Sequence, residues 1–249
     1  MTTPPYLKFI LCLILFYCLI SCKETGEVKL ELQNKQIYHT DLPKIRGDYE
    51  SNTSRQKSQN IITYTLSNTT NKKLLFLFEP QDLSPSAGIS PTTQYYGYVG
   101  FTITDRNDNI KKFYPHLPMW AETSDLSGCE LYQLQKKRDM YAKLEVETQK
   151  VDIVDRFINH SIVLYPGETR TFKALLKLPI VWETDRSLQK GGLYYPELEE
   201  GDAFKLFYYC KAGELRNSLP KYIQEELTEN EIEIFDGKLS ANPVKLKKR

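Results

Sequence analysis

An unbroken apolar run near the beginning of the chain constrains its organisation most. The run covers residues 9–20 and follows Lys8, the one charged side chain before residue 22. A helix that crosses a bilayer needs about 20 apolar residues, whereas a run of about 7–15 behind a positive residue is typical of a secretory signal peptide. We therefore expect residues 1–21 to be removed on export, so that the folded part begins at residue 22.

The apolar run ends with Leu19, Ile20, Ser21 and Cys22. These four residues resemble the lipobox of bacterial lipoproteins, and the resemblance covers residues 1–22. It implies that Cys22 receives a diacylglyceryl group on its sulfur, becomes the first residue after cleavage and is acylated on its new amine. The alternative is a plain secretory signal with an incidental cysteine, but an ordinary cleavage site shows an A-x-A-like pattern, which this segment lacks.

The residues after Cys22 indicate which membrane holds the protein. The second position of the mature chain is Lys23, not the Asp that in some Gram-negative lipoproteins signals retention in the inner membrane. Cys22, Lys23 and Glu24 loosely resemble the surface-export signals of other lipoproteins, although Thr25 interrupts the acidic run. We expect a lipid-anchored protein of the bacterial outer membrane that faces the periplasm or the cell surface.

The charge of the mature chain is balanced. Removing 21 of the 249 residues leaves 228, and removing Lys8 leaves 32 basic against 32 acidic side chains. A nucleic-acid partner usually requires a basic stripe, so we expect none. We expect a lipidated tether at residues 22–27 and a single domain at residues 28–249, a length that can bury a sizeable core.

Strand patterns dominate this domain. Apolar and polar residues alternate with period two at residues 28–32, 62–67 and 169–178, as in half-buried strands. Residues 204–210 are apolar on both faces, as a central strand would be. Polar turns at residues 68–72 and 105–109 predict two hairpins, 62–67 with 74–78 and 98–104 with 110–114. Residues 232–235 and 244–246 predict a final strand pair after Asp236 and Gly237.

Two segments carry helical patterns. Within residues 130–144, Leu131, Leu134, Tyr141 and Leu144 share one predicted face. Residues 218–227 offer an N-cap serine, a proline in the first turn and two apolar residues four apart. We expect the first segment to belong to a helical insertion near residues 130–157, and the second to be a loop helix.

The fold class follows from this pattern. Several short strands separated by turns predict a mainly β chain, an immunoglobulin-like antiparallel β-sandwich with a helical insertion. Residues 164–172 and 235–246 resemble pieces of immunoglobulin-like domains of secreted bacterial proteins. The Cys-Trp-Cys spacing of antibody domains is absent, since neither Trp120 nor Trp182 stands in such a frame.

Cys129 and Cys210 are the two cysteines that remain after export and lipidation. They form a disulfide in an oxidising compartment or stay separate thiols, because sequence alone does not fix the pairing. Cys129 with His116 or His160 as base would give a cysteine-dependent hydrolase. However, the sequence lacks G-x-S-x-G and H-E-x-x-H motifs, so we expect no catalytic site, metal or cofactor.

Aromatic residues are in surplus, with 17 Tyr, 11 Phe and 2 Trp. Rings with a polar tip suit binding surfaces, although β propensity alone also enriches strands in aromatic residues. The predicted ligand surface of loops and strand ends comprises Tyr95, Tyr96, Tyr98, Trp120, Tyr194 and Tyr195. The sequence thus favours a non-enzymatic, lipid-anchored protein that binds another envelope protein, with a glycan-binding lipoprotein for nutrient capture as the alternative.

Overall fold

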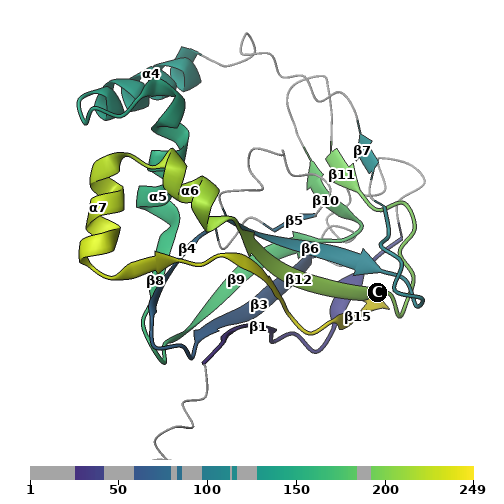
Figure 1. The fold of residues 1–249 in the computed structure, drawn as a ribbon. Helices are drawn as coiled ribbons and strands as arrows, with labels where there is room; N and C mark the ends of the chain where they lie inside the picture. Colours follow the sequence, from purple (N-terminus) through teal and green to yellow (C-terminus); the bar gives the residue numbers. More distant parts are fainter. Residues whose placement is uncertain are drawn as a thin grey trace, which may run out of the picture.

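The structure, a computed structural model, describes residues 26–41, 59–79, 83–85, 97–112, 114–116, 128–183 and 192–249. Figure 1 shows how their strands and helices are arranged. Strand exceeds helix within these residues, so the prediction of a mainly β chain is confirmed. The predicted signal peptide and Cys22 lie outside the described residues.

The first sheet consists of three antiparallel strands in the order β1–β3–β9 (Val28–Leu32, Gln59–Asn68 and Thr169–Lys177). The alternation predicted for β3 is confirmed, because Ile62, Tyr64 and Leu66 are buried while Ile61 is exposed. Tyr64 stands opposite Leu32 on one side and Phe172 on the other. The inner face of this sheet therefore supplies one wall of the core.

The largest sheet has the order β2–β15–β12–β6–β5, and β14 also pairs with β12. Its strands are Ile37–His39, Val244–Lys248, Ala203–Cys210, Tyr98–Thr104, Ser84–Pro85 and Gly237–Ser240. On one face of β12 every residue from Phe204 to Cys210 is buried, whereas on the other face Phe207 alone is buried, so the prediction of a strand apolar on both faces holds only in part.

Two smaller sheets complete the strands. One has the order β13–β4–β8 (Ile232–Ile234, Lys73–Leu77 and Ser161–Leu164). The other has the order β10–β11–β7 (Ile180–Glu183, Gly192–Tyr194 and Tyr114–His116). β13 pairs with β4 and β14 pairs with β12, so the continuous segment that contains both strands joins the small sheet to the largest one.

The predicted strand pairings were wrong in three places. β3 does not pair with β4, because β1 and β9 already occupy both of its edges. Beyond the turn at residues 105–109, the described residues of the second predicted hairpin form an isolated bridge between Thr104 and Ile110 instead of a continuous strand pair. β13 and β15 do not form a final pair, because β13 lies parallel to β4 while β15 lies between β12 and β2.

Four α-helices lie within the described residues: α4, α5, α6 and α7 (Gly128–Ala142, Val151–His160, Ala212–Ser218 and Lys221–Glu229). A 3-10 turn, η3 (Thr148–Lys150), precedes α5. The predicted insertion thus corresponds to α4 and α5. The helix predicted at residues 218–227 begins later, at Lys221, because Ser218 ends α6 instead of capping α7.

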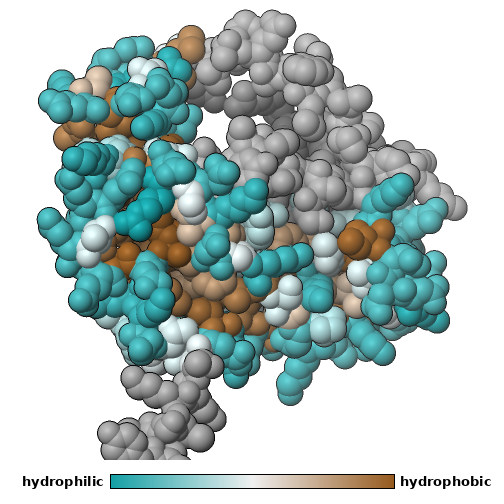
Figure 2. All heavy atoms as spheres, in the orientation of Figure 1, coloured by the Kyte–Doolittle hydropathy of each residue, from teal (hydrophilic) through white to brown (hydrophobic). Residues whose placement is uncertain are grey.

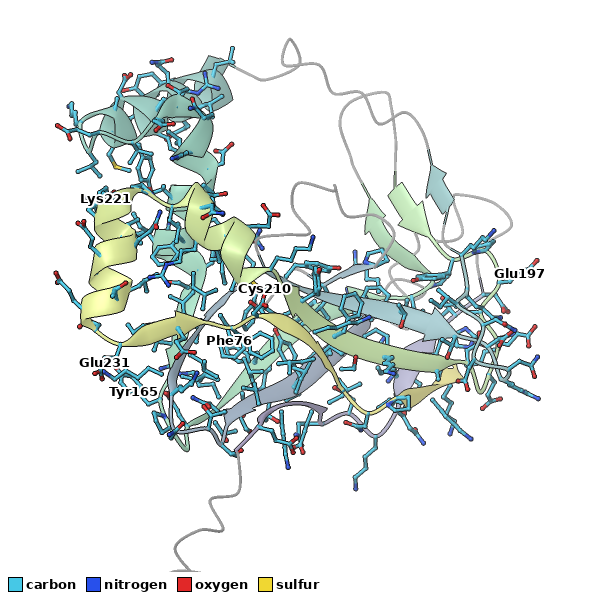
Figure 3. The ribbon with its side chains drawn as sticks, in the orientation of Figure 1. Phe76, Tyr165, Glu197, Cys210, Lys221 and Glu231 are labelled. Atoms are coloured by element: carbon cyan, nitrogen blue, oxygen red, sulfur yellow. The ribbon has the colours of Figure 1, made fainter. Side chains whose placement is uncertain are left out.

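Aromatic rings fill the space between the sheets. Phe78 lies 5.3 Å from Phe172 of β9 and 5.6 Å from Tyr208 of β12, measured between ring centroids. Phe76 of β4 lies 5.4 Å from Tyr208, and Figure 3 shows Phe76 among the side chains between the strands. Tyr64 of β3 lies 5.4 Å from Phe172, so this aromatic cluster packs β3 and β9 against β4 and β12.

Candidate functional site

The structure describes only part of the predicted aromatic surface. Tyr95, Tyr96 and Trp120 lie outside the described residues, and so does the side chain of Tyr194. Whether these four form a ligand surface therefore stays a prediction.

Tyr98 and Tyr195, the two described members, lie in different surroundings. Tyr98 is half-buried on β6, with its ring 5.6 Å from Phe207 and 6.2 Å from Tyr209, and burial raises its pKa. Tyr195 was wrongly predicted to lie on a surface. It is 2% exposed and packs 6.3 Å from Phe101, because the chain after β11 turns its ring into the core.

The two cysteines lie on different elements. Cys210 is buried at the end of β12, where Figure 3 shows it at the junction of sheet and helices. Cys129 belongs to the first turn of α4, which Figure 1 shows well away from the end of β12. A disulfide needs Cα atoms within about 7 Å, so this arrangement disfavours the bridge.

The histidines do not gather into one site among the described side chains. His160 ends α5, with its Nε2 atom 3.5 Å from Oε1 of Glu79. His39 of β2 is fully buried, and neither of its ring nitrogens has a hydrogen-bond partner among the described residues. Burial lowers the pKa of His39. No cluster of three metal-binding side chains occurs in the part of the chain that the structure describes.

The described helices include none that is long and apolar enough to cross a membrane.

Exposed apolar side chains gather on the helices. Among the described residues ten large hydrophobic side chains are exposed, and six of them come from α4, the turn after it, α5 and α7, namely Leu131, Tyr132, Met140, Leu144, Ile158 and Tyr222. We call these six the helical surface. Figure 2 shows hydrophobic side chains at α4 and in the gap between α4 and α7, bordered by hydrophilic ones. Leu131 and Met140 are nine positions apart on α4 and therefore lie on opposite sides of that helix. The six residues are thus separate candidate contacts for a partner, spread over neighbouring helices.

The sequence located α4 but did not reveal this surface. The predicted apolar face placed Leu131 and Leu144 beside Tyr141. In the structure Tyr141 is 2% exposed, whereas Leu131 and Leu144 are 47% and 51% exposed. That part of the prediction was wrong, because α4 contacts the rest of the protein along a narrow stripe and leaves its flanking apolar residues in solvent.

Polar contacts hold α4 on α5 beneath the helical surface. The hydroxyl of Tyr141 donates to Asp155 at 2.9 Å, and Nζ of Lys137 lies 2.6 Å from the same carboxylate. Burial raises the pKa of Tyr141 to about 12. Burial also pushes the pKa of Asp155 upward, but hydrogen bonds from Lys137 and Tyr141 outweigh it, and the net shift is downward. The charged form of Asp155 is thus stabilised, and α4 is fixed at one end while its outer side stays open.

Comparisons with protein-family models, with curated proteins and with solved structures found no match to this chain. The proposed function therefore rests on the positions and exposure of the chain's own residues.

Proposed function

We propose that this chain is a lipid-anchored bacterial envelope protein with a non-enzymatic role, which binds another envelope protein through the helical surface. The observation that carries the binding role is the concentration of exposed apolar side chains on α4, α5 and α7. Burying such side chains against a partner supplies about 25 cal/mol per Å² of apolar area, and aromatic anchors often dominate protein interfaces.

The leader supports the anchoring half of the proposal. A short apolar run that ends at Cys22 has the features of a lipoprotein signal, and three acyl chains would hold far more firmly than one. The described chain enters β1 at the lower edge of Figure 1, whereas α4 lies at the upper edge. A tether before β1 would therefore leave the helical surface accessible to a partner.

The proposal includes the finer fold class. Aromatic packing between β3, β9, β4 and β12 supports an immunoglobulin-like sandwich in which α4 and α5 form an insertion. Such a sandwich would act as a rigid support for the helices. The aromatic loop residues Tyr95, Tyr96 and Trp120 are the second candidate for the interface.

Substitutions on the helices test the binding role. Met140→Ser with Tyr222→Ser should lower recovery of a cross-linked envelope partner by about tenfold or more, since both side chains lose apolar contact area. The matched control is Ile110→Ser with Tyr165→Ser, two exposed apolar residues that lie outside the helical surface.

Equal recovery of partner by both double variants would contradict the proposal. Loss of the partner only on alanine substitution of Tyr95, Tyr96 and Trp120 would place the interface on the aromatic loops instead. Thermal unfolding of each variant controls for loss of the fold.

A further inference from the structure

Two large apolar residues stand side by side on the outer face of the first sheet. Ile61 of β3 is directly opposite Leu175 of β9, and they are 60% and 73% exposed. Their strand neighbours on this face include Thr63 and Lys173, which suit a solvated surface. An apolar cross-strand pair at this position therefore has no role in the core between the sheets.

Lysines surround this pair. Lys173 and Lys177 precede and follow Leu175 on the same face of β9. Lys35 follows Asn34, whose side-chain amide donates to the carbonyl of Ile61 at 2.8 Å. All three lysines are at least partly exposed. An apolar centre with a cationic rim complements the interface of an anionic lipid bilayer.

The length of the tether brings this face within reach of a membrane. Val28, the first residue of β1, is six positions after Cys22, and an extended chain over six positions spans about 20 Å. Val28 pairs with Asn68 at one end of β3, while Ile61 lies seven residues away toward the other end, a distance of about 23 Å along a strand. If the sheet lies flat on the bilayer, the tether can reach the membrane from Val28 while Ile61, at the other end of β3, also touches the membrane.

From these observations we propose that the outer face of β1–β3–β9 rests on anionic phospholipid headgroups, with Ile61 and Leu175 inserted at the interface. This inference rests on the proposed lipid anchor. Tethering makes the contact intramolecular, with an effective concentration in the millimolar range. Two apolar side chains and three lysines therefore suffice to orient the domain, although they would bind free vesicles only weakly.

A fluorescent label placed at the proposed contact tests the inference. The mature lipidated protein carries Cys129→Ser and Leu175→Cys, the latter labelled with a polarity-sensitive fluorophore, in vesicles of phosphatidylethanolamine and phosphatidylglycerol. The buried Cys210 should not react in the folded protein. The matched control carries the label at Ile110→Cys, an exposed apolar position on the loop after β6.

The label at residue 175 should report an apolar environment and the label at residue 110 an aqueous one. Adding Ile61→Ser should lower the ratio of docked to undocked protein roughly tenfold, and replacing phosphatidylglycerol with phosphatidylcholine should also lower it. An aqueous signal from residue 175 in protein that floats with the vesicles would overturn the docking and leave the anchor intact.

Two further outcomes would also count against docking. Protein that does not float would refute the anchor, and the docking inference would fail with it. If the apolar signal from residue 175 disappears when fewer protein molecules are present per vesicle, the label contacts a second copy of the protein and not lipid.

Discussion

Replacing Asn68 with alanine should destabilise the fold by about 3 kcal/mol, because its buried side chain holds the corner between two sheets. Its amide nitrogen donates to the carbonyl oxygens of Lys72 and Leu164 at 2.7 and 2.9 Å. Its side-chain oxygen accepts the backbone N–H of Thr70 at 3.0 Å. Each such bond contributes about 1 kcal/mol net, and a buried group left unpaired costs at least as much.

The assay is urea unfolding of the mature domain, with thermal unfolding as a second readout. A loss of about 3 kcal/mol should lower the Tm by about 6–12 °C in a domain of this size. Asn71→Ala is the matched control, since Asn71 is an exposed residue of the same turn, and it should change stability by less than about 0.5 kcal/mol. A loss for Asn68→Ala below about 1 kcal/mol would refute the argument that this side chain secures the corner.

Three further predictions concern buried groups. Burial lowers the pKa of His39 from 6.5, so below pH 6.5 the unfolded chain binds a proton at His39 more readily than the folded chain does. The free energy of unfolding should therefore fall as the pH drops below 6.5. His39→Gln should flatten this pH dependence in thermal unfolding measured between pH 7.5 and 5. Burial raises the pKa of the Cys210 thiol to about 11, so iodoacetamide at pH 8 should modify it only in urea, and non-reducing peptide maps should show no bond to Cys129. Nζ of Lys111 lies 3.0 Å from the buried carboxylate of Asp202, and Lys111→Met would leave that charge buried without its ion-pair partner. The substitution should lower the free energy of unfolding in urea by about 3 kcal/mol, and an unchanged unfolding midpoint would contradict this.

Local patterns in the sequence predicted strands well but not their partners. The alternation of Ile62, Tyr64 and Leu66 fixes which side of β3 is buried, because side chains on a strand point alternately to opposite faces. Pairing depends instead on which sheet edges are open after the whole chain has folded. β3 and β4 are joined by a turn with a hairpin-like sequence, yet they belong to different sheets because both edges of β3 are occupied.

The candidate site was harder to predict than the strands. The spacing in α4 located the helix, but the same spacing would place Leu131 and Leu144 in the core beside Tyr141, and in the structure Tyr141 reaches the core while both leucines are exposed. The prediction for Tyr195 failed in the opposite direction. Its place after a strand end predicted an exposed side chain, whereas its ring is buried and contacts Phe101. The exposure of these residues depends on tertiary contacts, which the spacing of apolar residues in α4 and after β11 does not encode.

Metabolic labelling with palmitate tests the lipid anchor most directly. We predict that the wild-type protein incorporates the label, sediments with membranes and has an intact mass that corresponds to a chain beginning at Cys22 with three acyl groups. Cys22→Ser should incorporate no label and should keep residues 1–21. A wild-type protein without label, or a Cys22→Ser protein that retains both the label and the mature size, would contradict the proposed function.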